Sequence, residues 1–148
     1  MMRYIGFERE EEAETWARER IKIKGPTGFF RAASAVDEAG EFVCVVVMSN
    51  FTAKNIDLNI AIDAKKVRPK GTILMFNEIF GFVFNKLKAI RVTGLVHAEN
   101  NQAKKINEHF GFKLEGVMRK AFDGADMHIY GFLAEEYHTH PWHRAALP

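Results

Sequence analysis

Apolar and polar residues alternate without error over residues 55–63, and this period of two predicts a β-strand. One face of the strand carries isoleucine and leucine, and the other carries polar or small residues: Ile56, Leu58, Ile60 and Ile62 against Asp57, Asn59, Ala61 and Asp63. We expect the apolar face to pack on the core and the other face to meet solvent or a cleft.

The same reasoning predicts elements in the order β-α-β-β-β-α-β-α-β-β. The predicted strands cover residues 3–7, 29–36, 42–48, 55–63, 90–96, 112–122 and 127–133, and the predicted helices cover 8–21, 72–87 and 101–110. Strand 42–48 is almost wholly apolar, which predicts burial on both of its faces. The order predicts one α/β (α+β) domain over residues 1–137 with a mixed, mostly antiparallel sheet, followed by a C-terminal tail over 138–148.

Composition narrows the function classes. A chain of 148 residues with 47% hydrophobic content fits a single domain with a sizeable core. Its 21 basic and 19 acidic residues give a net charge of +2, which argues against nucleic acid as a partner. No apolar run approaches the length of a membrane span, and the first residues lack the apolar stretch of a signal peptide. We therefore expect a cytoplasmic protein with no membrane partner.

The cysteine and the clustered histidines both have structural interpretations. Cys44 is the one cysteine and sits inside the apolar strand, where burial raises a thiol pKa and disfavours a nucleophile. His138, His140 and His143 form H-x-H-x-x-H, and three imidazoles could bind zinc. No cysteine or carboxylate stands at ligand spacing in this terminal segment, so we favour a solvated tail and predict no metal.

The loop over residues 68–73 suggests an anion site. It follows the alternating strand and opens an apolar helix, whose first backbone N–H groups and positive dipole end suit a pyrophosphate. Gly71 removes a Cβ where backbone and phosphate would touch, and Arg68 and Lys70 add cationic donors. Taken alone, the same residues also fit a plain joint between a loop and a helix.

The second half of the chain carries a family motif. The chain resembles the GNAT N-acetyltransferases, most closely their ribosomal-protein-acetylating branch, whose motif runs N-x-x-S, then G-F-x-x-E-G-x-x-R, then a final strand ending in E-Y. The matching residues are Asn100, Gly111, Phe112, Glu115, Gly116, Arg119, Glu136 and Tyr137. Arg68-x-x-Gly71 then falls where the family has its Q/R-x-x-G-x-G/A acetyl-CoA loop.

The resemblance implies a GNAT-like domain that binds acetyl-CoA. The end of strand 55–63 would splay from strand 90–96, helices would cover both faces, and the pantetheine arm would lie in the gap. Backbone amides around residues 67–72 would bind the pyrophosphate, an N–H near Ile62 would polarise the thioester, and Asn100 would fix the pantetheine or the adjacent backbone. Lys104 and Lys105 would meet the 3′-phosphate, with a solvated helix face as the alternative. The implied cofactor-binding residues are Ile62, Val67, Arg68, Lys70, Gly71, Thr72, Asn100 and Lys104.

The implied reaction is direct transfer of acetyl to a primary amine of a protein N-terminus, a lysine or a small molecule. Such a transfer needs a neutral amine, a stabilised oxyanion and a departing thiolate. The candidate bases are His97 and Glu99, which follow strand 90–96, and Asp57 on the polar face of strand 55–63. A surface or structural role remains the alternative for each.

Three positions depart from the family pattern. Ile73 replaces the final Gly or Ala of the loop, Ala103 replaces the serine, and Asn107 replaces the tyrosine that often acts as general acid. These departures motivate an alternative function, a catalytically inactive GNAT-fold binding or structural module. An exposed strand face could also support a homodimer.

Overall fold

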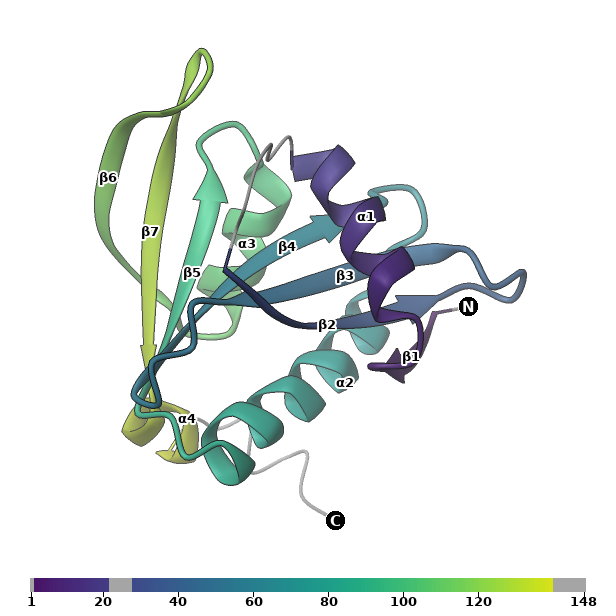
Figure 1. Ribbon diagram of the computed structural model, residues 1–148, viewed down its shortest axis with the longest axis horizontal. Coiled ribbons are helices and arrows are strands. Elements are labelled where there is room, and N and C mark those ends of the chain that lie inside the picture. The colour runs from purple at the N-terminus through teal and green to yellow at the C-terminus, as the bar shows by residue number, and fades with distance from the viewer. Residues whose placement is uncertain (1, 22–27, 140–148) are drawn as a thin grey trace.

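The computed structural model describes residues 2–21 and 28–139, whose central feature is a seven-stranded sheet (Figure 1). The strands are β1 (Arg3–Gly6), β2 (Phe29–Val36), β3 (Phe42–Ser49), β4 (Asn55–Ile62), β5 (Arg91–His97), β6 (Lys113–Phe122) and β7 (Ala125–Leu133). Their order across the sheet is β1-β2-β3-β4-β5-β7-β6. Only β4 and β5 pair in parallel, and every other neighbouring pair is antiparallel. The predicted mixed, mostly antiparallel sheet is therefore confirmed.

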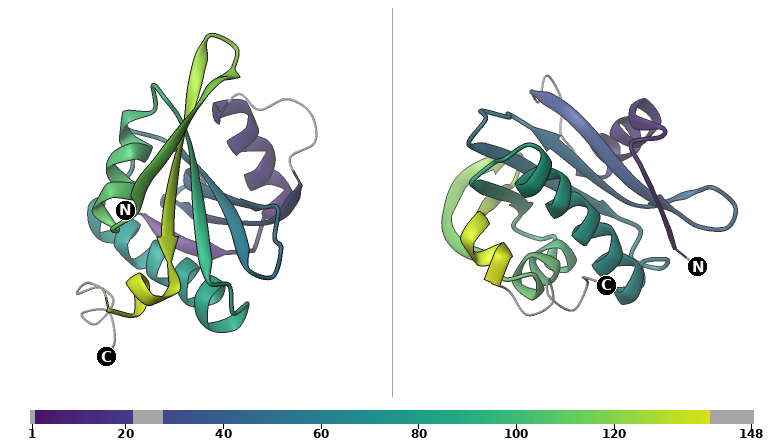
Figure 2. Two further views of the ribbon diagram at one scale, coloured as in Figure 1. Left: turned by 90° about the vertical axis from the view of Figure 1, so that its left-hand side faces the viewer. Right: turned by 90° about the horizontal axis from the view of Figure 1, so that it is seen from below.

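Helices cover both faces of the sheet, as predicted (Figures 1 and 2). Helix α1 (Glu10–Ile21) packs on β2, β3 and β4 from one side. Helices α2 (Pro69–Phe80) and α3 (Asn101–His109) lie on the opposite side, and a short helix α4 (Ala134–Thr139) follows β7. None of these helices has the length and apolar character needed to cross a membrane.

Strand β3 runs through the middle of the molecule, and all of its residues are buried, as its apolar run predicts. Cys44, Val46 and Met48 point into a large cluster on the side of α2 and α3. Val45 and Val47 point the other way, into a smaller cluster beneath α1. One continuous apolar strand thus supplies the cores of both layers.

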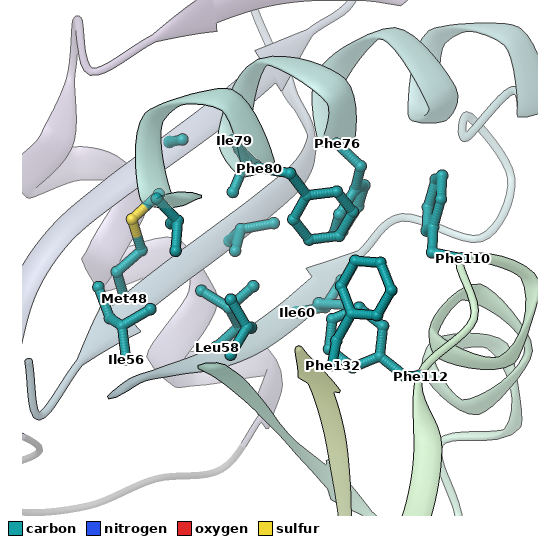
Figure 3. Packing of buried hydrophobic residues seen from close by; sticks show 14 of the residues in the cluster. Met48, Ile56, Leu58, Ile60, Phe76, Ile79, Phe80, Phe110, Phe112 and Phe132 are labelled. Carbon is teal, nitrogen blue, oxygen red and sulfur yellow. The ribbon is translucent and has the colours of Figure 1, made fainter. Parts of the chain in front are cut away.

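The large cluster is built around Phe80 of α2 (Figure 3). Its ring centroid lies between 5.2 and 5.8 Å from those of Phe76, Phe110, Phe112 and Phe132. These rings come from α2, from the end of α3, from the residue before β6 and from β7. Their packing therefore holds α2 and α3 in fixed positions beside the open ends of β4 and β5.

Two predicted boundaries differ from the structure around α2. This helix begins at Pro69, three residues before the predicted start, because proline suits the first helical position. After Phe80 the chain continues as a π-helical segment, η1 (Gly81–Lys86), instead of as a regular α-helix.

The last strand ends at Leu133, as its residue pattern predicts, whereas the strand end that the family motif implies at Glu136-Tyr137 is wrong, because both residues lie in α4. The Glu136 carboxylate accepts a hydrogen bond from the Leu133 N–H at 3.1 Å, which is the backward half of a capping box. The Tyr137 ring stacks on Phe84 with centroids 5.0 Å apart. Helix α4 therefore closes one end of the core, and it includes His138, which we had assigned to the tail.

The pairing of β4 and β5 stops halfway along the strands. Asn55–Leu58 pairs with Arg91–Gly94, and no pairing follows beyond these residues. The C-terminal ends of the two strands diverge, which Figure 1 shows as two arrowheads pointing apart. The predicted splayed strand pair is confirmed.

Candidate functional site

The gap between β4 and β5 exposes backbone groups of β4. On its other side β4 bonds to β3, where the Asp63 N–H donates to the Val43 carbonyl at 2.8 Å. Successive N–H groups of a strand point in opposite directions, so that of Ile62 points away from β3 and into the gap. No residue of β5 pairs with Ile62 there. Its N–H is therefore placed to meet a ligand.

A central cavity of about 220 Å³ lies in this gap. Its walls include Asn59 of β4, His97 and Glu99 at the end of β5, and Ala103 of α3. The His97 Nδ1 accepts a hydrogen bond from the Glu99 N–H at 3.1 Å. A neutral imidazole that accepts at Nδ1 carries its proton on Nε2, so His97 presents a donor in this geometry. The structure thus brings two of the three candidate bases together.

Asp57, the third candidate base, lies elsewhere. It sits on the paired part of β4 opposite Thr93, which precedes His97 by four residues, on the order of 13 Å at about 3.3 Å per residue. Its carboxylate accepts hydrogen bonds from Asn50 Nδ2 at 3.0 Å and from Asn55 Nδ2 at 2.9 Å. Asp57 is part of a side-chain network on the paired strands and does not join His97.

A second cavity of about 370 Å³ lies between the start of α2 and α3, and we call it the α2–α3 cavity. Its lining includes Arg68 and Ile73 from the predicted loop, and Lys105 and His109 from α3. Of the two lysines expected to meet the 3′-phosphate, Lys105 lines this cavity and Lys104 does not. Ile73 is half-buried and also packs against the large core cluster, so its branched side chain turns partly into the core.

The backbone donors at the start of α2 are fewer than the sequence indicated. The Val67 N–H donates to Asp63 at 3.0 Å and the Thr72 N–H to Arg68 at 3.0 Å, so both are already engaged. Pro69 has no N–H. The N–H groups of Arg68, Lys70 and Gly71 stand at the positions that a helix leaves without an internal partner. These three donors, with the helix dipole, form the part of the loop that suits an anion.

Gly71 serves a different purpose from the one expected. A Cβ at Gly71 would lie 2.9 Å from Met2 Sδ and 3.1 Å from Met2 Cβ. The absence of a side chain at Gly71 makes room for Met2 of the N-terminal segment. We expected it to make room for phosphate, and the structure gives a different reason for a glycine here. The Gly71 N–H keeps its place among the free donors.

Asn100 caps α3, since its Oδ1 accepts a hydrogen bond from the Ala103 N–H at 3.1 Å. Asn107, the residue in place of the family tyrosine, is buried and donates from Nδ2 to the Ala103 carbonyl at 2.9 Å. A Cβ on Gly94 of β5 would lie only 2.7 Å from Asn107 Oδ1. Asn107 therefore packs closely on Gly94 where α3 meets β5, and it carries no ionisable proton.

A third and larger hollow of about 940 Å³ opens on the face that α1 covers, and we call it the α1-side cavity. It lies between Glu19 of α1, the end of β5 and the β6–β7 turn at Asp123. It shares His97, Glu99 and Phe122 with the central cavity, so the two cavities are neighbours. On the other face, α3 lines the central cavity with Ala103 and the α2–α3 cavity with the flanking residues Gln102 and Ile106. The gap between β4 and β5 thus has the α1-side cavity on one face of the sheet and the α2–α3 cavity on the other.

Sequence reasoning gave no role to Asn59, which lines the central cavity. It also treated Lys104 and Lys105 alike, although Lys105 lines the α2–α3 cavity and Lys104 does not. The one signal for Asn59 is its place on the polar face of the alternating strand, which does not separate it from Asp57. Nothing in the sequence separates Lys105 from Lys104, because both are adjacent lysines on a short helix.

Within residues 2–21 and 28–139, no group of three or more His, Cys, Asp or Glu residues is placed to hold a metal ion. Of the H-x-H-x-x-H motif, His138 belongs to α4, and His140 and His143 lie outside the described residues. Burial raises the pKa of the Cys44 thiol to about 12, in keeping with the predicted structural role.

The sheet order, the parallel pair that opens halfway and the helices on both faces define the fold of the GNAT acetyltransferases. No family model and no curated protein matches the sequence. Solved structures do match in fold. The dodecameric spermidine N-acetyltransferase from Vibrio cholerae, in its intermediate state, is 16% identical with a TM-score of 0.68 over 95% of this chain and 97% of that chain.

Two other solved structures are similar to a comparable degree. A GCN5-related N-acetyltransferase from Brucella melitensis is 20% identical with a TM-score of 0.66, over 91% of this chain and 62% of that one. The ribosomal-protein-S5-alanine acetyltransferase from Vibrio fischeri is 18% identical with a TM-score of 0.61, over 72% of this chain and 62% of that one. At these identities the likeness establishes the fold, and it does not single out the ribosomal-protein-acetylating branch.

Proposed function

We propose that this protein transfers an acetyl group from acetyl-CoA to a primary amine. The observation that carries the proposal is the opening between β4 and β5, which has a cavity on each face of the sheet. A thioester on one side can meet an amine on the other only through such an opening. The similar solved structures are those of acetyltransferases, which supports the same activity.

Acetyl-CoA would bind on the side of α2 and α3. The free N–H groups of Arg68, Lys70 and Gly71 would bind the pyrophosphate at the helix N-terminus. Lys105 would add positive charge from α3, with Lys104 beside it. The side chains of Val67 and Thr72 line the same cavity and would contact the pantetheine arm.

The chemistry needs no covalent enzyme intermediate. The amine lone pair attacks the thioester carbonyl carbon, a C–N bond forms, the C–S bond breaks, and CoA leaves as a thiolate with a thiol pKa of about 8.5. The Ile62 N–H would stabilise the tetrahedral oxyanion, and the Asn100 cap would hold the start of α3 beside the reacting group.

Glu99 is the better placed of the two neighbouring proton acceptors. Its carboxylate is exposed and can take the amine proton through water. His97 presents Nε2–H, so it would act first as a donor and would accept a proton only after its bond to the Glu99 N–H opens. Asp57 would act only indirectly, because its hydrogen bonds from Asn50 and Asn55 hold it on the paired strands, away from His97.

The test is a thermal-melt titration with acetyl-CoA, with desulfo-CoA as a second ligand and ATP as the control. At about 100 times its Kd a ligand stabilises by roughly 2.7 kcal/mol, worth about 5 to 10 °C in a domain of this size. The double variant Arg68→Glu/Lys105→Glu should lose most of the shift, and the matched variant Lys54→Glu, in the β3–β4 turn, should keep it. A CoA-specific shift then justifies an amine screen that follows thiol release.

The alternative is a catalytically inactive module of the same fold, which the buried, non-ionisable Asn107 favours. It predicts a protein that releases no CoA with any amine. No shift at millimolar acetyl-CoA would overturn the proposed transfer altogether.

A further inference from the structure

We propose that the α1-side cavity takes a primary amine on a linear alkyl stem that carries a second positive charge, and that Asn59 positions the reacting nitrogen. This inference rests on the proposed acetyl transfer and names the class of acceptor.

Asn59 is an unusual residue for the interior of a sheet. It is only 8% exposed, and it follows Leu58, the last residue of β4 that pairs with β5. In the described part of the chain its carboxamide has no hydrogen-bond partner, and it lines the central cavity. Because the carboxamide borders the cavity with no partner among the described residues, its donors and acceptor are available to a bound polar group. The floor of the cavity is therefore built for a polar ligand.

The chemistry of a carboxamide suits an amine that is about to react. The Oδ1 atom can accept a hydrogen bond from the amine N–H, which leaves the nitrogen lone pair free to attack. A carboxamide does not take up the proton, so that proton must go to another group, such as Glu99. Asn59 is thus a positioning residue, not a base.

The mouth of the α1-side cavity carries negative charge. Glu19, Glu99 and Asp123 are exposed around it, and none of the three has an ion-pair partner within the described ranges. Arg18, on the same rim, is paired with Glu14 at 3.5 Å.

Arg20, the cation at the edge of the central cavity, is turned toward its own helix. Its guanidinium lies 4.1 Å from the centroid of the Trp16 ring. The mouth is therefore free to attract a second cation from the acceptor.

The shape of the two cavities favours a linear molecule. The α1-side cavity adjoins the smaller central cavity of about 220 Å³, whose lining includes the apolar residues Leu95 and Phe122. An alkyl stem along these residues would have one nitrogen at Asn59 and the second at the carboxylates. A small diamine or polyamine has this form and is the acceptor that we assign, and a lysine in a basic peptide is the alternative that the experiment tests.

The first experiment compares kcat/KM for 1,4-diaminobutane with that for pentylamine, its isostere with one charge. Each exposed carboxylate contributes up to about fivefold, so we expect a preference of about tenfold at low salt. At 1 M salt the Debye length falls to about 3 Å, and the preference should nearly vanish. Equal kcat/KM for the two amines at low salt would overturn the inference. Acetylation of a basic peptide but of neither amine would overturn the assignment to a small acceptor.

Variants assign the preference to residues. Glu19→Gln/Asp123→Asn should lower the ratio of the two kcat/KM values toward one, and Glu38→Gln in the distant β2–β3 turn should not change it. Asn59→Leu should lower kcat/KM for both amines by about 10- to 150-fold, because a hydrogen bond to a charged or reacting group is lost. The same variant should keep the melting temperature, since no hydrogen bond within the described residues is lost with the Asn59 side chain. Wild-type kcat/KM in Asn59→Leu would contradict the role of this residue.

A binding measurement separates this inference from the proposed function. If acetyl-CoA binds but no amine is acetylated, the transfer fails, and calorimetric titration of 1,4-diaminobutane into the free protein tests the cavity directly. Binding that is lost in both Asn59→Leu and Asn59→Ala, with the folded state intact by circular dichroism, supports the site. Binding that is unchanged in these variants overturns it.

Discussion

Replacing Gly94 of β5 by alanine places a methyl group against the side chain of Asn107 in α3. The new Cβ would lie 2.7 Å from Asn107 Oδ1 and 3.4 Å from Phe112 Cδ2. Asn107 is only 2% exposed, and its Nδ2 bonds to the Ala103 carbonyl, so it cannot swing aside without losing that bond. Overpacking costs about 1–3 kcal/mol and the lost hydrogen bond about 1 kcal/mol, while a less flexible unfolded chain returns about 0.4–1 kcal/mol. We expect Gly94→Ala to lower the free energy of unfolding by about 1–3 kcal/mol.

Urea denaturation measures this change at constant slope, and a double-mutant cycle assigns it. Asn107→Ala removes the atom that obstructs the methyl group, so the double variant should be more stable than the sum of the two single changes by at least about 1 kcal/mol. Gly81→Ala is the matched control. Its Cβ would meet nothing within 4 Å, and alanine in a helix should gain about 0.5–1 kcal/mol. Additive single changes, or a neutral Gly94→Ala, would refute the reasoning.

Three further predictions follow from burial and charge. Because burial raises the pKa of Cys44 to about 12, its thiol should resist disulfide reagents at pH 8 in the native protein and react once urea unfolds it; stoichiometric labelling of the folded state would contradict this. A hydrogen bond from Arg91 lowers the pKa of Glu115 below its ordinary 4.5, so this pair stabilises the fold above that pH and loses its effect as the pH falls through the lower value. Arg91→Ala should return the Glu115 pKa toward 4.5 in an NMR titration and reduce stability at pH 7 by less than about 1 kcal/mol. Phe80→Ala should cost about 3–5 kcal/mol in urea melts, whereas Leu74→Ala, at a side chain 56% exposed on the same helix, should cost under about 1 kcal/mol.

The strands could be predicted because each has its own local signal. The alternation over residues 55–62 and the apolar run over 42–49 reflect one buried face and two buried faces respectively. The splay of β4 from β5 has no such signal, because both strands keep a regular pattern to their ends. That expectation depended on the resemblance carried by Asn100 and the G-F-x-x-E-G segment.

The site was harder to predict, because its geometry depends on partners far apart in the chain. Asp57 looks like a free carboxylate in the sequence, yet two asparagine amides bind it. Gly71 looks like a phosphate contact in the sequence, yet Met2 occupies the space next to its Cα where a side chain would lie. Glu136 looks like the end of a strand, yet its carboxylate caps the helix that starts there. Each of these outcomes is decided by a tertiary contact or a cap, which a pattern of residue types does not encode.

The glutamate of the family motif, Glu115, also depends on residues far away in the sequence. Glu115 reaches across β7 to Arg91 of β5, and a Cβ on Gly131 would collide with its carboxylate. This ion pair spans three neighbouring strands, from β6 over β7 to β5, and so favours one register of β6 beside β7. In the sequence, these three residues show no relation to one another.

The open strand pair also bears on how the protein avoids aggregation. The outer edge strand, β6, is irregular after Leu114 and after Met118 and carries several exposed charges, features that discourage pairing with another sheet. The gap between β4 and β5 has unpaired backbone groups as well, but it lies inside the sheet. Both bordering strands belong to the same sheet and pair with each other over Asn55–Leu58 and Arg91–Gly94, so the unpaired groups do not form an outer edge. The fold therefore keeps backbone groups available to a ligand without presenting them as an edge strand to another protein.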